Sequence, residues 1–198
     1  MTIDDGHVIG LQQFHGTAPR HSAFNVLLMA DGFTQDQQDD FDDACKRFRD
    51  SLLKAVPFNQ LKNKINIFGL NVASRDSGVS DTRHHFVRRF TYFDALFDAG
   101  SEWVLICEER HAMETAAEWL PEPHVAIVMA NTAEYGGSGR PGVAVCSMHP
   151  NSALIALHEM GHSVRAGRRI RHAPGHLRRG RQSAAGRRAQ RTQCHPRP

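Results

Sequence analysis

Short apolar runs alternate with helix-like patterns along most of the chain, and this alternation constrains the fold more than any other feature. Each run is bounded by Gly, Pro or polar residues, as is typical of strands buried in a sheet. The expected strands are residues 25–30, 65–72, 103–107, 125–130 and 142–148. Because helical patterns separate several of these strands, the order predicts an α/β domain. A length of 198 residues suits one domain with a substantial core.

Two helices are expected between these strands. Thr34 and Gln37 form a capping box, and apolar residues then recur at helical spacing as far as Pro57, namely at Phe41, Cys45, Phe48, Leu52 and Val56. A second helix is expected over residues 112–120. Residues 73–90 are polar and basic, so we expect a loop there whose charges are solvated.

The strongest chemical signal is the sequence His-Glu-Met-Gly-His at residues 158–162. On a helix, residues four apart share one face, so His158 and His162 can direct imidazole nitrogens at one metal ion, with Glu159 beside it. This is the H-E-x-x-H arrangement of zinc peptidases. Zinc lowers the pKa of a bound water and polarises the scissile carbonyl, while the glutamate acts as general base. The pattern therefore predicts peptide hydrolysis with Zn²⁺ as cofactor.

The pattern alone is only suggestive, because a chain with 13 His contains it by chance in roughly 3% of cases. The residues before it strengthen the prediction. Asn151 and Ser152 can cap a helix whose Leu154, Leu157 and Gly161 would face inward, leaving the two histidines on a neighbouring strip. The alternative reading is a pair of ordinary surface histidines.

Two segments before the motif bear on substrate binding. Zinc peptidases commonly hold an extended peptide along a sheet edge, and residues 143–148 are either that edge strand or an ordinary core strand. The glycine-rich sequence from Tyr135 to Gly139 is expected to be a turn. It lacks the lysine and the following helix of a phosphate-binding loop, which excludes nucleotide binding of that kind.

Charge divides the chain into two unequal parts. Residues 165–198 hold 11 Arg and no acidic residue, so the first 164 residues hold 13 basic and 21 acidic side chains, a net charge of −8. Four cysteines, Cys45, Cys107, Cys146 and Cys194, have no metal-site or disulfide spacing, and we expect reduced thiols, the first three buried. The chain as written has no signal peptide or membrane-spanning run, so we expect a cytoplasmic protein.

Several motifs together resemble the IgA peptidase type of zinc metallopeptidase. They run in the family's order over residues 24–164: Asn25 to Phe33, Pro57-Phe58, Asn66 to Phe68, Ser74, Ser77-Gly78, Asn131, Tyr135 to Gly139, and His158 to Ser163. The resemblance implies a zincin-like α/β metalloprotease domain with a mixed sheet, flanking helices and an active-site helix. It also implies that His158 and His162 bind zinc, that Glu159 is the general base, and that peptides or proteins are the substrates. Members of the family can be secreted.

The chain departs from this pattern after the second histidine. The family continues with Gly-Leu-Ala-Asp-Glu-Tyr, whose Asp is expected to be the third zinc ligand, but no acidic residue follows Glu159 here. Codons exist for residues 165–174 that encode Gly-Leu-Ala-Asp-Glu-Tyr-Asp-Thr-Pro one frame over, with the Asp at the codon of Arg168. We infer a reading-frame shift, which would also explain the Arg-rich composition of the tail.

These observations predict three segments: an N-terminal leader over residues 1–23, an incomplete metallopeptidase domain over 24–164 that lacks its C-terminal part, and a disordered, Arg-rich tail over 165–198. Two histidines leave zinc weakly held, so hydrolysis by this chain should be slow or absent. His172 or His176 could supply a third ligand, although the tail has no apolar periodicity to hold either in place.

Two other functions remain open from the sequence. The basic tail could attach a non-catalytic domain to nucleic acid or another anionic surface, without sequence preference because the tail has no aromatic residue. This reading is the weaker one, since a frame shift explains both the missing ligand and the change of composition. The remaining alternative is a product with no function because the shortened domain does not fold.

Overall fold

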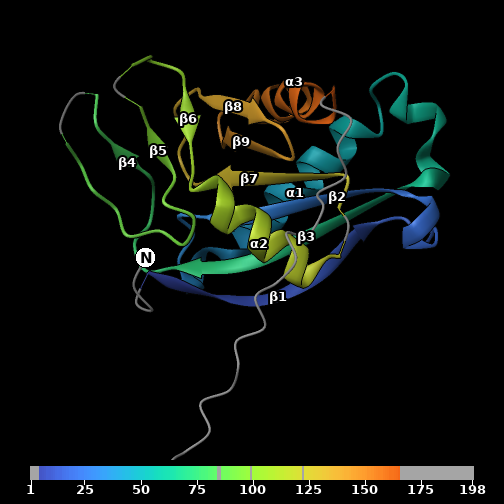
Figure 1. Cartoon of the computed structure of the whole chain (residues 1–198), viewed down its shortest axis with the longest axis horizontal. Helices are drawn as coiled ribbons and strands as arrows, with labels where there is room; N and C mark the ends of the chain where they lie inside the picture. The colour runs from blue at the N-terminus through green and yellow to red at the C-terminus, as the bar shows by residue number, and fades with distance from the viewer. Residues whose placement is uncertain (1–4, 84–85, 99, 122, 166–198) are drawn as a thin grey trace, which may run out of the picture.

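The computed structural model describes residues 5–83, 86–98, 100–121 and 123–165. Its centre is a six-stranded sheet of order β1-β3-β2-β7-β9-β8 (Figure 1). The strands are β1 (Gly6–His15), β2 (Phe24–Asp31), β3 (Ile65–Ser74), β7 (Val125–Ala130), β8 (Gly137–Arg140) and β9 (Val143–Ser147). The four inner strands are parallel to one another, while β1 and β8 run antiparallel at the two edges. The α/β architecture and the mixed sheet agree with the sequence prediction.

Three helices flank this sheet: α1 (Gln38–Leu52), α2 (Glu109–Trp119) and α3 (Ser152–Arg165). The chain passes from β2 through α1 to β3 on one side of β2, and then through α2 to β7 on the other side. Because parallel crossovers are right-handed, these opposite moves place α1 and α2 on opposite faces of the sheet. Helix α3 packs beside α1, so α1 and α3 share one face and α2 covers the other.

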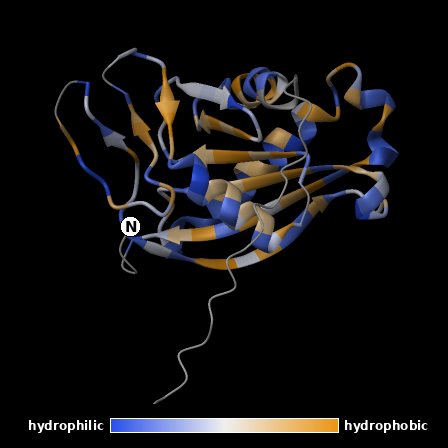
Figure 2. Cartoon of the chain, in the orientation of Figure 1, coloured by the Kyte–Doolittle hydropathy of each residue, from blue (hydrophilic) through white to orange (hydrophobic). Residues whose placement is uncertain are grey.

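The core lies between these layers, and Figure 2 shows the apolar strands sandwiched inside. Residues Val26 to Ala30 on β2 and the whole of β7 are buried. Strands covered on both faces read as continuous apolar runs, which explains why the sequence located these two so well. Of the cysteines, Cys45 and Cys146 are buried and Cys107 is partly buried, all as free thiols; Cys194 lies outside the described residues.

A small three-stranded sheet of order β4-β5-β6 extends from the edge near β8. It consists of β4 (Ser80–Asp81), β5 (Leu96–Phe97) and β6 (Leu105–Ile106). We call residues 80–106 the side lobe. The strand predicted over residues 103–107 is regular only at Leu105–Ile106, because the lobe is held by loop hydrogen bonds more than by regular pairing. Short 3₁₀ turns complete the chain at Arg20–Ser22, Gln35–Gln37, Phe58–Gln60 and Lys62–Lys64.

Three predictions about the elements need correction. Helix α1 begins after the predicted capping box of Thr34 and Gln37 but ends at Leu52, so Val56 lies outside it and is 74% exposed. Residues 6–15, placed in an N-terminal leader, form edge strand β1 of the same sheet. Residues 137–139 of the predicted glycine-rich turn belong to β8, the other edge strand of the sheet. Of the two alternatives for residues 143–148, the core strand is confirmed, because β9 lies between β7 and β8.

Of the tail predicted over residues 165–198, Arg165 is the last residue of α3, and residues 166–198, with His172 and His176, lie outside the described residues. Within the part that is described, no helix is both long enough and apolar enough to cross a bilayer.

Candidate metal centre

Helix α3 carries the predicted metal ligands and packs against β8, β9 and α1. Its buried face is formed by Ile155, Ala156 and Met160. The prediction that Leu154 faces inward is wrong, since this side chain is 66% exposed. Gly161, also expected to face inward, is exposed, and Leu157 is only half-buried. The predicted strip therefore lies largely on the exposed side of the helix, because the sheet and α1 meet α3 from the side of Ile155 and Met160. His158 and His162 are both exposed.

The two histidines converge on one point. Their Nε2 atoms are 3.1 Å apart and their rings meet edge to face, with centroids 4.8 Å apart and an interplanar angle of 78°. Two imidazole nitrogens bound tetrahedrally to zinc at 2.0–2.1 Å would be about 3.3 Å apart. The pair therefore fits two positions of one zinc ion without a change of helix geometry.

A third ligand is not found among the residues that the structure describes, which contain no group of three His, Cys, Asp or Glu side chains able to hold a metal. Downstream, the sequence supplies no carboxylate after Glu159. The described residues therefore offer a metal two imidazoles, with Glu159 as their neighbour.

Glu159 lies between α3 and edge strand β8. A Cβ atom built on Gly139 would lie 3.0 Å from Glu159 Oε2, 2.9 Å from His162 Cβ and 2.5 Å from the Glu159 carbonyl oxygen. A Cβ on Gly137 would lie 2.6 Å from Ile155 Cγ2. Glycine at these two positions therefore allows the edge strand to approach the helix so closely that its backbone borders the carboxylate.

The charge of Glu159 also reaches the strand beneath it. Burial, with a smaller contribution from the negative charge of Glu159, raises the pKa of the Cys146 thiol to about 12. The thiol therefore stays protonated at neutral pH and is not a nucleophile.

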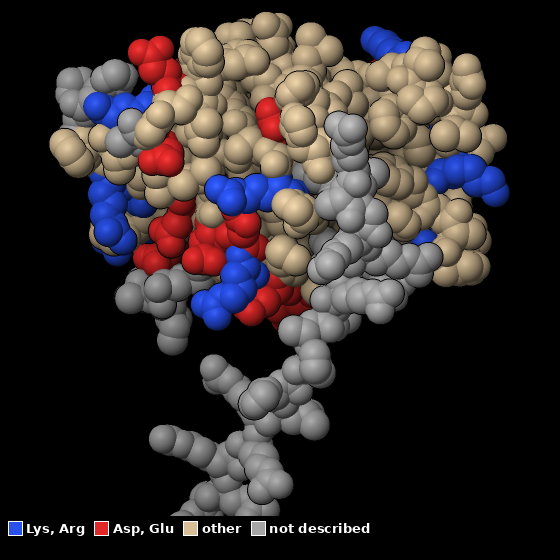
Figure 3. Space-filling view, turned by 45° about the horizontal axis from the view of Figure 1, so that its top comes forward, with Lys and Arg blue, Asp and Glu red and all other residues tan. Residues whose placement is uncertain are grey.

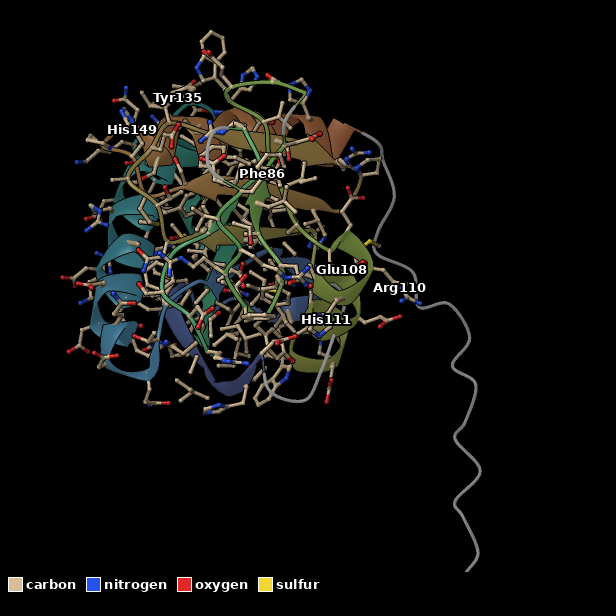
Figure 4. All side chains as sticks on the ribbon, turned by 90° about the vertical axis from the view of Figure 1, so that its left-hand side faces the viewer. Phe86, Glu108, Arg110, His111, Tyr135 and His149 are labelled. Carbon is tan, nitrogen blue, oxygen red and sulfur yellow. The ribbon has the colours of Figure 1, made fainter. Side chains whose placement is uncertain are left out.

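An aromatic pair lies near the start of β8. The rings of Tyr135 and His149 meet edge to face with centroids 5.4 Å apart. Figure 4 shows both at the surface, away from Glu108, Arg110 and His111 at the start of α2. His149 Nδ1 accepts a hydrogen bond from the Asn151 amide at 3.1 Å. The pair therefore fixes the loop that leads from β9 into α3.

Two charged residues have structural roles that the sequence did not reveal. Asp31, the residue after the strand predicted over residues 25–30, is fully buried at the end of β2 and accepts hydrogen bonds from the Phe93 and Ala95 amides and the Thr91 hydroxyl. Arg83, expected in a solvated loop, has a side chain only 5% exposed and bonds to Asp81. The sequence signal for Asp31 is an aspartate directly after an apolar run; nothing in the sequence distinguishes Arg83 from its exposed neighbours.

Comparison with known protein families matches residues 12–167 to IgA Peptidase M64. The chain belongs to the IgA peptidase M64 family. The match confirms the family that the motifs of residues 24–164 indicate, and it includes α3 with both histidines. Membership of this peptidase family makes proteins or peptides the expected substrate class. A search of curated proteins gave no match.

Proposed function

We propose that this M64 domain is a zinc metallopeptidase in which His158 and His162 hold the metal and Glu159 is the general base. The observation that carries the proposal is the 3.1 Å approach of the two Nε2 atoms on an exposed helix face beside a glutamate. When bound, zinc would supply Lewis acidity, which polarises the scissile carbonyl and makes the attacking water more acidic.

The residues of the chain have separate tasks in this reaction. Glu159 accepts the proton of the attacking water and passes it to the leaving amine. The backbone of Gly139, which borders the Glu159 carboxylate, lies where an extended peptide would be held. Strand β8 is the sheet edge next to α3, so main-chain hydrogen bonds to it would orient the substrate.

We further propose that this chain is a weak or inactive form of such an enzyme. Two protein ligands hold zinc poorly, and a catalytic site normally has three. The reading-frame shift accounts for the missing carboxylate, since the shifted frame places an aspartate at the codon of Arg168.

Hydrolysis of a quenched fluorescent peptide library with added zinc tests the proposal. The restored variant carries Gly-Leu-Ala-Asp-Glu-Tyr-Asp-Thr-Pro at residues 165–173. We expect cleavage by the restored variant, loss of at least about 100-fold on adding Glu159→Gln, and little or no cleavage by the natural sequence. Glu118→Gln, an exposed glutamate on α2, is the matched control and should leave cleavage unchanged. Cleavage that survives Glu159→Gln would refute the assigned base.

A further inference from the structure

The outer edge of β8 is not uniformly open. Successive residues of a strand direct their amides to opposite sides, so Gly137 and Gly139 point theirs the same way. The Gly137 amide donates to the Trp103 carbonyl oxygen at 3.0 Å, on the side away from β9. The N–H and C=O of Gly139 therefore also face the outer edge.

Residues 103–105 cover this edge at Gly137, and we call them the strap. Val104 forms a parallel bridge with Gly137, and the Ser138 hydroxyl donates to the Leu105 carbonyl oxygen at 2.6 Å. The strap also belongs to the side lobe, because the Asp98 amide donates to the Val104 carbonyl oxygen at 3.1 Å. One half of the edge is thus occupied by the chain itself.

Arg83 fixes the strap in this position. Its guanidinium group lies 2.9 Å from Asp81 and 2.8 Å from Glu134, which is three residues before β8. It also donates to the Glu102 carbonyl oxygen, immediately before the strap. The group lies 3.7 Å above the Phe97 ring centroid. The largely buried guanidinium group of Arg83 therefore joins the lobe, the strap and the segment before β8.

We infer that the strap is a specificity-determining element, which limits main-chain pairing on this edge to the outer groups of Gly139. The site then takes a short extended peptide segment, because a longer strand would need the outer groups of Gly137 that Trp103 and Leu105 cover. This inference rests on the proposed function, since it concerns the edge at which a substrate would bind. Arg83 is a positioning residue that acts through the strap.

Amide exchange and peptide titration, both followed by NMR on the full chain, test the inference. In the unmodified chain we expect the Gly137 amide to exchange at least about tenfold more slowly than the Gly139 amide, because among the described residues only the Gly137 amide has a backbone partner at this edge. Ser138→Ala should reduce that protection because it removes the hydrogen bond to the Leu105 carbonyl. Arg83→Lys should also reduce it, because lysine lacks the planar guanidinium group that contacts Asp81, Glu134 and the Glu102 carbonyl together. Ser101→Ala, in the turn before the strap, is the control.

The probes are blocked alanine peptides of three and eight residues, each with one lysine for solubility, monitored at the Gly139 resonance. The unmodified chain should bind both with similar affinity, whereas Ser138→Ala should favour the longer peptide by about fivefold, the equivalent of one added hydrogen bond. Fast exchange of Gly137, or the same length preference in both proteins, would overturn the inference. A protected Gly137 with no peptide response at Gly139 in any variant would instead refute peptide binding at this edge, and the specificity role with it.

Discussion

Asp31 joins the central sheet to the side lobe through a single buried carboxylate. It accepts hydrogen bonds from the Phe93 amide at 2.7 Å, the Thr91 hydroxyl at 2.9 Å and the Ala95 amide at 3.0 Å. Burial raises its pKa from 3.8 to about 6, and the three hydrogen bonds only partly oppose this shift. The carboxylate therefore organises the lobe, but keeping it ionised while buried costs folding free energy, and this cost depends on pH.

The sign of that dependence is fixed by linkage. The folded state binds the Asp31 proton more tightly than the unfolded state, so the contribution to stability is greatest below pH 4 and is lost as the pH rises to about 6. The loss is up to about 3 kcal/mol. We expect urea denaturation to show that the unfolding free energy of the natural chain, relative to that of Asp31→Asn, falls as the pH rises from 4 to about 6. A constant difference between pH 4 and pH 7 would contradict the role given to Asp31.

Single residues show where sequence reasoning succeeds and where it fails. His158, Glu159 and His162 could be predicted because ligand chemistry depends on residue type and helical spacing, both visible in the sequence. The burial of Asp31 and Arg83 depends on loops that meet only in the folded chain. Leu154 was misplaced because helical periodicity gives the width of the buried face more reliably than its orientation.

At the level of elements, the closest contact in the candidate site is that of β8 with α3. A methyl group on Gly139 would approach the backbone of Glu159 to 2.5 Å, so Gly139→Ala must push the strand and helix apart. We expect a loss of about 1–3 kcal/mol in unfolding free energy and weaker zinc binding, because Glu159 and His162 move with the helix.

Gly10→Ala on β1 is the matched control for Gly139→Ala. No atom lies within 4 Å of a Cβ at that position, so stability should be unchanged or slightly improved. Equal effects of the two substitutions, measured by urea denaturation and zinc titration, would show that the close approach of β8 is not needed.

Elements buried on both faces were predictable and edge elements were not. β2 and β7 are continuous apolar runs, and the capping box located the start of α1. β8 consists of Gly, Ser, Gly and Arg, which have low strand propensity, and it forms because β9 and α3 hold it. β1 was missed because its burial alternates irregularly around bulges.

For the whole molecule, charge separates the domain from the tail. The first 164 residues carry a net charge of −8 and residues 165–198 carry 11 Arg. Figure 3 shows acidic side chains gathered on one face of the described domain. We expect heparin or nucleic-acid columns to retain the natural chain but not a version ending at Arg165, with retention lost as salt rises. Retention of the shortened chain at the same salt concentration would show that the Arg-rich tail is not the binding element, and a preference among nucleic-acid sequences would contradict attachment by charge alone.

The most direct test of the account is a titration of zinc by calorimetry into the natural chain, His162→Ala and the restored variant. We predict weak binding of one zinc per natural chain, its loss in His162→Ala, and affinity at least about 100-fold higher in the restored variant, as expected when a third ligand completes the site. Zinc binding that is equal in the natural chain and His162→Ala, or that does not tighten in the restored variant, would contradict the metal centre proposed on α3.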